Sequence, residues 1–233
     1  MCISVSVCLS LARFISFDVA GATATEADDV NAVGDITGIY FDTSGVEHGF
    51  LRSANVFDVP HSTSLTGLRI NDDATVTGVA HDSLGHTRGF VYASGKARHF
   101  RVGRGDTAAL DINNLGAVVG TFATDNDDED SFIRSADGKT RKFAISGPVI
   151  ATVSTCINDN GAVAGGALDD SIVGNFADSG GVTHGFVRAP DGSIMTLDYP
   201  GSKATSPNLI NDQGEIVGYH ADSSGGHGFI YFP

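Results

Sequence analysis

The last stretch of the chain, residues 210–233, decides the fold and reads INDQGEIVGYHADSSGGHGFIYFP. It contains a turn, an apolar run, a second turn and a second apolar run, because Asn, Asp and Gly favour the backbone conformations of tight turns. Elsewhere in the chain, a run of this second kind is followed by one more strand. Here that strand is missing, so the edge at residues 228–232 lacks a partner, and an unpaired sheet edge is a liability that proteins normally cover.

The same pattern occurs five times along the chain. In each copy a Phe follows a small residue and precedes an aliphatic one, at Phe50, Phe90, Phe132, Phe186 and Phe229. Upstream, an Asn follows an apolar residue, at Asn31, Asn71, Asn113, Asn158 and Asn211. The resulting period of about 40 to 45 residues is typical of four-stranded propeller blades.

Each copy predicts four short strands, which we letter A to D. In the second copy they are residues 65–70, 75–81, 88–93 and 97–102. Strand B carries a recurring glycine, at Gly38, Gly78, Gly120, Gly174 and Gly218. The two residues before each glycine are apolar or β-branched, and they point to opposite faces of the strand. Both faces of every sheet are therefore expected to be covered, as in blades stacked face to face.

The two ends of the chain carry complementary halves of a blade. Residues 15–19 form a strand D without a strand C, whereas the last copy has a strand C without a strand D. The predicted fold is therefore all-β: a five-bladed β-propeller of four-stranded antiparallel blades, closed by pairing of the N-terminal strand with the C-terminal blade. Phe17 should lie beside Phe229. The repeats are residues 20–59, 60–102, 103–145, 146–199, and 200–233 with 14–19, and residues 1–13 are an apolar leader or an extra strand.

The fourth copy departs from the pattern, since its strand-B motif occurs twice, at residues 162–165 and 172–174. We align the second occurrence with the other copies and interpret the nine-residue insertion as a long hairpin loop.

Three motifs resemble the HAF-type extracellular repeat of bacterial secreted proteins: FDVPH at residues 57–61, INDQGEIVGYHAD at 210–222 and GGHGFIY at 225–231. The resemblance covers nearly the whole chain after Arg13. Copies two and three depart from it, with Arg88 in place of the His and with DEDSFIR at residues 128–134. The resemblance implies a secreted or cell-surface location and carries no catalytic residues.

Composition excludes several classes of function. With 28 acidic and 14 basic residues, the net charge of −14 disfavours binding to nucleic acid or to an anionic membrane. The apolar start is too short to span a bilayer. The three cysteines, Cys2, Cys8 and Cys156, show no CxxC spacing that would indicate a thiolate zinc site. We expect a monomer that binds an extracellular ligand, either a glycan or a protein.

Acidic turns are the candidate metal sites. The run DNDDED at residues 125–130 offers the hard oxygen ligands that Ca²⁺ prefers, through Asp125, Asp127, Asp128 and Asp130. Its spacing is not that of an EF-hand, and a solvated acidic loop is the alternative interpretation. The Asp that follows strand B in each copy is interpreted as the start of an Asx-turn. The His that precedes the GF dipeptide in three copies, at His48, His184 and His227, is interpreted as a structural residue that bonds a neighbouring turn.

Loops that join strand D to strand A, and strand B to strand C, should emerge on one face of the propeller. The candidate ligand-binding residues on that face are His61, Arg104, Asp106, Ser202 and Lys203. Repetition without a unique polar cluster favours a non-catalytic extracellular or cell-surface binding module. The alternative is a secreted hydrolase that cleaves a glycan or a similar polymer with carboxylates at the channel mouth.

Overall fold

The computed structural model describes residues 16–52, 55–125, 128–144, 151–168, 176–177, 183–189, 191–211, 213–223 and 225–233. These residues form 20 β-strands. Nowhere in these ranges is there a helix with the length and apolar character that crossing a membrane requires.

The strands fall into five blades in chain order. The first blade contains β1 (Ala24–Val30), β2 (Ile36–Phe41), β3 (Glu47–Leu51) and β4 (Asn55–Phe57). The second contains β5 (Ser64–Ile70), β6 (Val76–His81), β7 (Thr87–Ala93) and β8 (Lys96–Phe100). The third contains β9 (Thr107–Ile112), β10 (Val118–Ala123), β11 (Glu129–Arg134) and β12 (Thr140–Phe143).

The fourth blade contains β13 (Ala151–Ile157), β14 (Val163–Leu168), β16 (Thr183–Arg188) and β17 (Ile194–Leu197), with the short β15 (Phe176–Ala177) beside β16. The fifth contains β18 (Ala204–Ile210), β19 (Ile216–Ala221) and β20 (Gly226–Tyr231). Consecutive strands of a blade pair antiparallel, as predicted. Single parallel bridges, Glu129 to Ala151 and Thr183 to Ala204, link the last three blades into one hydrogen-bonded sheet.

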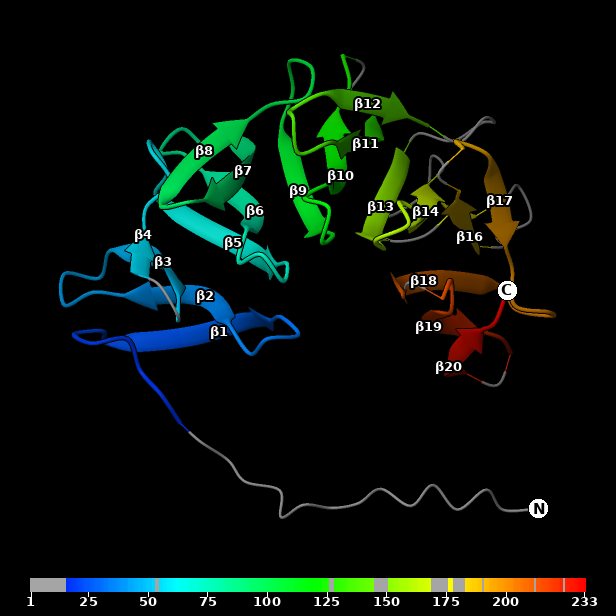
Figure 1. The fold of residues 1–233 in the computed structure, drawn as a ribbon. Helices are drawn as coiled ribbons and strands as arrows, with labels where there is room; N and C mark the ends of the chain where they lie inside the picture. The colour runs from blue at the N-terminus through cyan, green and yellow to red at the C-terminus, as the bar shows by residue number, and fades with distance from the viewer. Residues whose placement is uncertain are drawn as a thin grey trace.

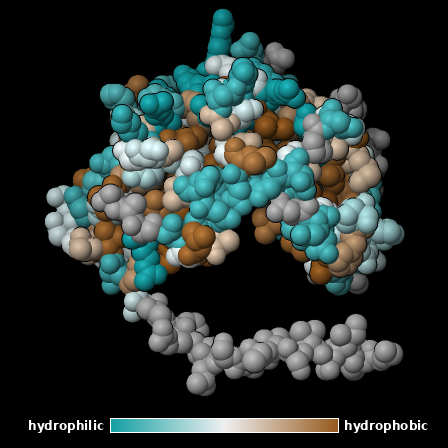
Figure 2. All heavy atoms as spheres, in the orientation of Figure 1, coloured by the Kyte–Doolittle hydropathy of each residue, from teal (hydrophilic) through white to brown (hydrophobic). Residues whose placement is uncertain are grey.

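The blades follow one another around an arc (Figure 1). The A strands β1, β5, β9, β13 and β18 line its inner side, and the D strands β4, β8, β12 and β17 lie on the outer side. The first and last blades stand at the two ends of this arc, and an opening separates them in the space-filling view as well (Figure 2).

The predicted closure of the ring is not observed in this structure. Among the described residues, segment 16–19 is not a strand and does not pair with β20. Instead, the ring of Phe17 packs edge-on against Phe50 of the first blade, with centroids 6.0 Å apart, and the guanidinium of Arg52 lies 4.9 Å from the Phe17 centroid. Phe100 packs against Phe132 and Arg134 in the same way within the array. The N-terminal segment therefore takes the place of a strand D, but without the strand C that would pair with it.

Internal blades are covered on both faces, as the pattern of strand B predicts. Val76 and Thr77 in β6, and Val118 and Val119 in β10, are all 0% exposed. In the last blade the corresponding Val217 is 42% exposed, because no further blade packs on that side.

The recurring glycine of strand B is required by a bulge in strand A. The register between the two strands shifts in every blade, for example between Val119 and Gly120. A Cβ added at Gly120 would lie 1.9 Å from the carbonyl oxygen of Ala108. At Gly38 the corresponding contact, with the carbonyl oxygen of Glu26, is 2.0 Å. Backbone proximity across a β-bulge therefore leaves no room for a side chain at this position.

The alignment of the fourth copy was wrong. In the other blades the strand-B glycine pairs with the Phe of the GF dipeptide, as Gly120 does with Phe132. In the fourth blade the residue paired with Phe186 is Gly165, so the first occurrence of the motif is strand B. The predicted Gly174 lies outside the described residues. The insertion then belongs to the hairpin between strands B and C, where a long loop was expected.

Candidate ligand-binding face

A ladder of asparagines joins the inner ends of the blades. The side-chain Nδ2 of each Asn that precedes the A–B turn donates to the main-chain oxygen of its equivalent in the next blade. The four bonds, of 2.8–3.0 Å, run from Asn31 to Asn71, Asn71 to Asn113, Asn113 to Asn158, and Asn158 to Asn211. Each of these Asn side chains also accepts main-chain N–H groups of its own turn through Oδ1, as Asn113 does from Ala117 at 2.8 Å. The sequence showed that these Asn residues recur once in each repeat, but it did not reveal the hydrogen bond that each makes to the next blade.

Carboxylates of the inner strands also bind the next blade. Asp29 accepts the N–H of Ile70 at 3.0 Å, and Asp111 accepts that of Ile157 at 2.9 Å. Burial raises the pKa of Asp111 to about 6, although the main-chain N–H groups of Ile157 and Ile112 and the charge of Arg69 act in the opposite direction. Because main-chain N–H groups already bind these oxygens, the carboxylates stabilise the blade junctions.

Cys156 lies next to this inner row. The thiol is free and buried, and burial, followed by the charge of Asp111, raises its pKa to about 12. A thiol of this kind is a poor nucleophile, because the thiolate is the reactive form.

The D–A and B–C turns do lie on one face, as predicted, and they bond to each other. The side chain of Asp106, in the turn that leads into β9, accepts the N–H of Thr87 at 2.9 Å. The main-chain oxygen of Asp106 accepts the N–H of Ala123 at the end of β10. One residue of a D–A turn thus fixes the B–C hairpins of two neighbouring blades.

Two pockets flank the third blade on this face. One, of about 310 Å³, is lined by Thr87, Asp106, Thr107, Ala108, Thr121, Ala123, Asp128 and Glu129. The other, of about 450 Å³, is lined by Gly103, Arg104, Phe122, Ala123, Thr124, Asp125, Asp130 and Lys142. The ammonium of Lys142 lies 4.5 Å from the ring centroid of Phe122, which holds this cation beside the acidic turn. Lys142 and Phe122 were not predicted as site residues, since neither stands in a D–A or B–C turn.

The structure brings only some of the predicted ligand-binding residues together. Arg104 and Asp106 share the turn between these two pockets. His61 is exposed in the D–A turn of the second blade, where its φ of +64° is a left-handed conformation that Gly21 and Gly201 adopt in equivalent turns. Ser202 and Lys203 lie in the turn before β18, and the Ser202 hydroxyl donates to the Tyr199 carbonyl at 2.8 Å. His61, Ser202 and Lys203 therefore belong to other blades of the same face.

The acidic turn does not assemble a metal centre from the residues that the structure describes. Asp125 is exposed, Asp128 and Asp130 are half-buried, and Asp127 lies outside the described ranges. Burial, followed by the charge of Asp128, raises the pKa of Asp130. Within the described ranges, no group of three or more His, Cys, Asp or Glu side chains is placed to hold a metal ion. The Ca²⁺ site stays a prediction.

The repeated histidines and aspartates bond turns, in agreement with their interpretation as structural residues. Asp42 accepts the N–H groups of Ser44 and Val46, both at 2.8 Å, as an Asx-turn requires. His48 Nδ1 lies 2.6 Å from Asp58 Oδ1, and this hydrogen bond is the main cause that raises the pKa of His48. His184 and Asp198 form the same pair in the fourth blade, at 2.8 Å.

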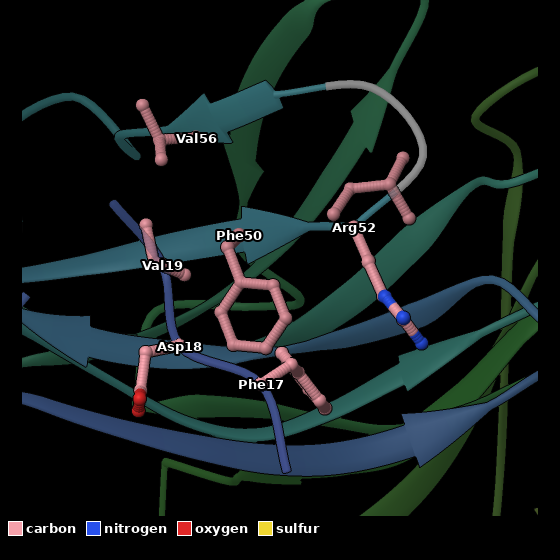
Figure 3. A pocket seen from close by; sticks show the side chains of 7 residues that line it. Phe17, Asp18, Val19, Phe50, Arg52 and Val56 are labelled. Atoms are coloured by element: carbon pink, nitrogen blue, oxygen red, sulfur yellow. The ribbon is translucent and has the colours of Figure 1, made fainter. Parts of the chain in front are cut away.

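A further pocket, of about 250 Å³, lies where the N-terminal segment meets the first blade (Figure 3). The packed rings of Phe17 and Phe50 line it, with Val19, Leu51 and Val56 contributing further apolar walls. The polar side chains among its lining residues are those of Asp18 and Arg52. Its mainly apolar lining is that of a packing junction between a strand D and the following blade.

No protein-family model and no curated protein matches the chain. Among solved structures, it is similar to the β-propeller domain of the Trilobed protease from Pyrococcus furiosus, with a TM-score of 0.57 and 10% identity over 91% of this chain and 67% of that one. It is also similar to a catalytically inactive virginiamycin B lyase from Staphylococcus aureus with quinupristin, with a TM-score of 0.52 and 12% identity over 90% and 70%. A streptogramin B lyase structure matches with a TM-score of 0.48 and 11% identity over 88% and 68%. At these identities the likeness identifies the fold alone: the chain has a β-propeller-type architecture.

Proposed function

We propose that this protein is a non-catalytic extracellular or cell-surface binding module, and that its ligand, a glycan or a protein, docks on the face made by the D–A and B–C turns. The observation that carries the proposal is the pair of pockets beside the third blade, between which Arg104 and Asp106 present charge of both signs. A rigid sheet scaffold that displays varied turns is typical of proteins that bind through loops.

Two features of the face support a binding role. His61 keeps a left-handed backbone where equivalent turns use glycine, and such strain in a non-glycine residue tends to occur at functional positions. The histidines and aspartates of the hairpins, including His48 and Asp42, are engaged in bonds that shape the turns. Their polar atoms thus define the surface of the turns and do not converge on a reacting centre.

The alternative, a hydrolase, is supported by one observation. Burial raises the pKa of Asp111 to about 6, and a carboxyl group of this kind could act as a general acid. However, one oxygen of Asp111 binds the N–H of Ile157, and Asp29 likewise binds Ile70. These bonds give both carboxylates a structural role at the blade junctions, so the binding module remains the proposed function.

The proposal includes the closed five-bladed ring. Segment 16–19 packs as a strand D on the first blade, and β20 lacks a strand D, so the two are complementary. The side chain of Asn211, the last of the asparagine ladder, donates to its neighbour Glu215 at 2.7 Å. In a closed ring it would instead reach the main chain of Asn31. Closure therefore predicts that Asn211→Ala destabilises the protein as much as Asn113→Ala, whereas an open arc predicts a much smaller effect.

A glycan array, a pull-down from extracellular protein fractions and a hydrolysis panel, run on the same preparation, test the proposed function. A ligand found in this way should lose affinity with Arg104→Gln, which removes a cation from the pocket on the proposed face. Lys139→Gln, a matched loss of charge in the C–D turn of the same blade, should leave binding unchanged. Turnover of a polymer that disappears in Asp111→Asn would contradict the binding module and establish the alternative.

A further inference from the structure

The junction between the second and third blades holds a cationic pocket of about 440 Å³. Its lining comes from strands C and D of the second blade and from the end of β11 in the third: Val91, Ala93, Ser94, Lys96, Arg98, His99, Arg134 and Ala136. It lies near C–D turns and therefore on the side of the blades away from the D–A and B–C turns. Three of these residues are Lys or Arg and none is acidic, although the protein has a net charge of −14.

The three cations of the pocket are not held in ion pairs. Lys96 and Arg98 are exposed, Arg134 is half-buried, and none of them forms an ion pair within the described ranges. Asp137 acts on Arg134 through its charge, but one of its oxygens lies 2.7 Å from the ammonium of Lys139. The guanidinium of Arg134 lies 4.7 Å from the ring centroid of Phe100, and Arg98 lines the same pocket. Like charges that line one pocket repel each other, and a bound anion would relieve this repulsion.

The other blade junctions show that the fold does not require these charges. In each of the first four blades, one residue of strand D pairs with the aliphatic residue that follows the GF dipeptide in strand C. This strand-D residue is Asn55, Arg98, Arg141 and Met195, in that order. The position equivalent to Arg134 in the next blade is Tyr92, Arg134, Arg188 or Tyr231, respectively. At the first junction Tyr92 stacks on Phe57 with centroids 4.1 Å apart, so a neutral aromatic ring serves the packing equally well. The paired arginines are thus specific to the two middle junctions.

We propose that the pocket between Arg98 and Arg134 binds a small anionic sugar, whose sulfate or carboxylate group lies between the two guanidinium groups. The volume lies within the range of roughly 300 to 1,000 Å³ found for small-molecule sites, and it exceeds what an inorganic anion alone would fill. Ser94 and His99 offer hydrogen-bonding groups for sugar hydroxyls, while Val91 and Ala136 provide apolar walls. Arginine is suited to both anionic groups, because its planar fork of donors bonds two oxygens at once.

The overall charge of the protein favours a short ligand over a long polyanion. Beyond the pocket, an anionic polymer would approach a surface whose net charge is −14 and would be repelled. A single charged sugar experiences mainly the local field of Lys96, Arg98 and Arg134, since more distant charges are screened beyond about 10 Å at 0.1 M salt. The site is separate from the ligand-binding face, so either proposal can fail without the other.

Isothermal titration of the full chain with glucose 6-sulfate, D-glucuronate and uncharged glucose tests the proposal. At least one of the two anionic sugars should bind with a dissociation constant on the order of 1 mM or lower. Affinity should decrease several-fold as NaCl rises from low to high concentration. Glucose should produce no binding heat. If sulfate and carboxylate ligands differ, the tighter one identifies the anionic group that the pocket selects.

The protein's own repeats supply variants that should fold normally. Arg98→Asn and Arg134→Tyr each place in this junction the residue that the first junction carries, and each should weaken binding about tenfold or more, the effect of losing one charge-assisted hydrogen bond. Arg52→Tyr, at the position of the first blade equivalent to Arg134, is the control and should bind as tightly as the unmodified protein. Unfolding temperature measured for each variant confirms that it is folded. Equal affinity of the unmodified protein and both variants would overturn the proposal, as would binding of heparin without binding of either monosaccharide.

Discussion

The asparagine ladder can be tested at a buried rung by Asn113→Ala. The side chain of Asn113 is 4% exposed and makes three hydrogen bonds: its oxygen accepts the N–H groups of Leu115 and Ala117, and its nitrogen donates to the main-chain oxygen of Asn158. Removing it leaves a buried carbonyl in the next blade and turn N–H groups without partners. We expect the free energy of unfolding to decrease by about 3 kcal/mol, since each bond contributes about 1 kcal/mol and unsatisfied buried groups add to the loss.

The adjacent Asn114→Ala is the matched control. Asn114 also makes three side-chain hydrogen bonds between blades, two with Asp72 and one with Asp159, but it is exposed. Water can replace the lost partners there, so the cost should stay below about 1 kcal/mol. The two variants thus remove the same number of bonds and differ in burial.

Urea denaturation followed by far-ultraviolet circular dichroism measures both changes. A loss of 3 kcal/mol corresponds to a decrease of roughly 6 to 12 °C in melting temperature for a domain of this size, which calorimetry resolves easily. If Asn113→Ala costs no more than Asn114→Ala, the ladder does not hold the blades together and the reasoning is refuted. Equal large losses in both would show that exposure does not decide the cost.

Four further predictions concern the core and the inner strands. Phe132→Ala, at a fully buried position, should cost about 3 to 5 kcal/mol by urea denaturation, and a silent change would contradict the assigned register. Gly120→Ala should prevent native folding, seen as loss of a cooperative melt, because its Cβ would overlap the Ala108 carbonyl. The pKa of Asp111 is raised from 3.8 to about 6 in the folded state, so its contribution to stability is fully present below pH 4 and is lost as pH rises through about 6. In Asp111→Asn, the free energy of unfolding should lose this pH-dependent part, which amounts to up to about 3 kcal/mol. Cys156 should react with iodoacetamide at pH 8 only after denaturation, and rapid labelling of the Cys156 peptide in the native protein, measured by mass spectrometry, would show that the thiol is not buried.

The turns and the strand order could be predicted because they depend on local chemistry. Asn, Asp and Gly at fixed offsets mark the turns, and Asp42 forms the predicted Asx-turn. Alternating apolar residues in strand B predicted sheets covered on both faces, and Val118 and Val119 are both fully buried. These signals are contained within a single repeat, so one sequence is enough to read them.

Features that depend on pairing between distant segments were less accessible. The strand-B motif occurs twice in the fourth repeat, and only the pairing of Gly165 with Phe186 shows that the first occurrence is strand B. The bond from Asn71 to Asn113 joins residues of two blades, which no pattern within one repeat reveals. The cationic pocket was missed for the same reason, since Arg98 and Arg134 are far apart in sequence and meet only when the blades stack.

The asparagine ladder also has a consequence for engineering. Because every interior unit presents one amide donor to its successor and one main-chain acceptor to its predecessor, neighbouring units are in principle interchangeable. Duplicating residues 60–102 in tandem should therefore lengthen the array by one unit without a new interface, as in other modular proteins whose stability is a sum over nearest neighbours. In the open arc this would move the two ends apart by one module, whereas the proposed closed ring would have to open or accept a sixth blade.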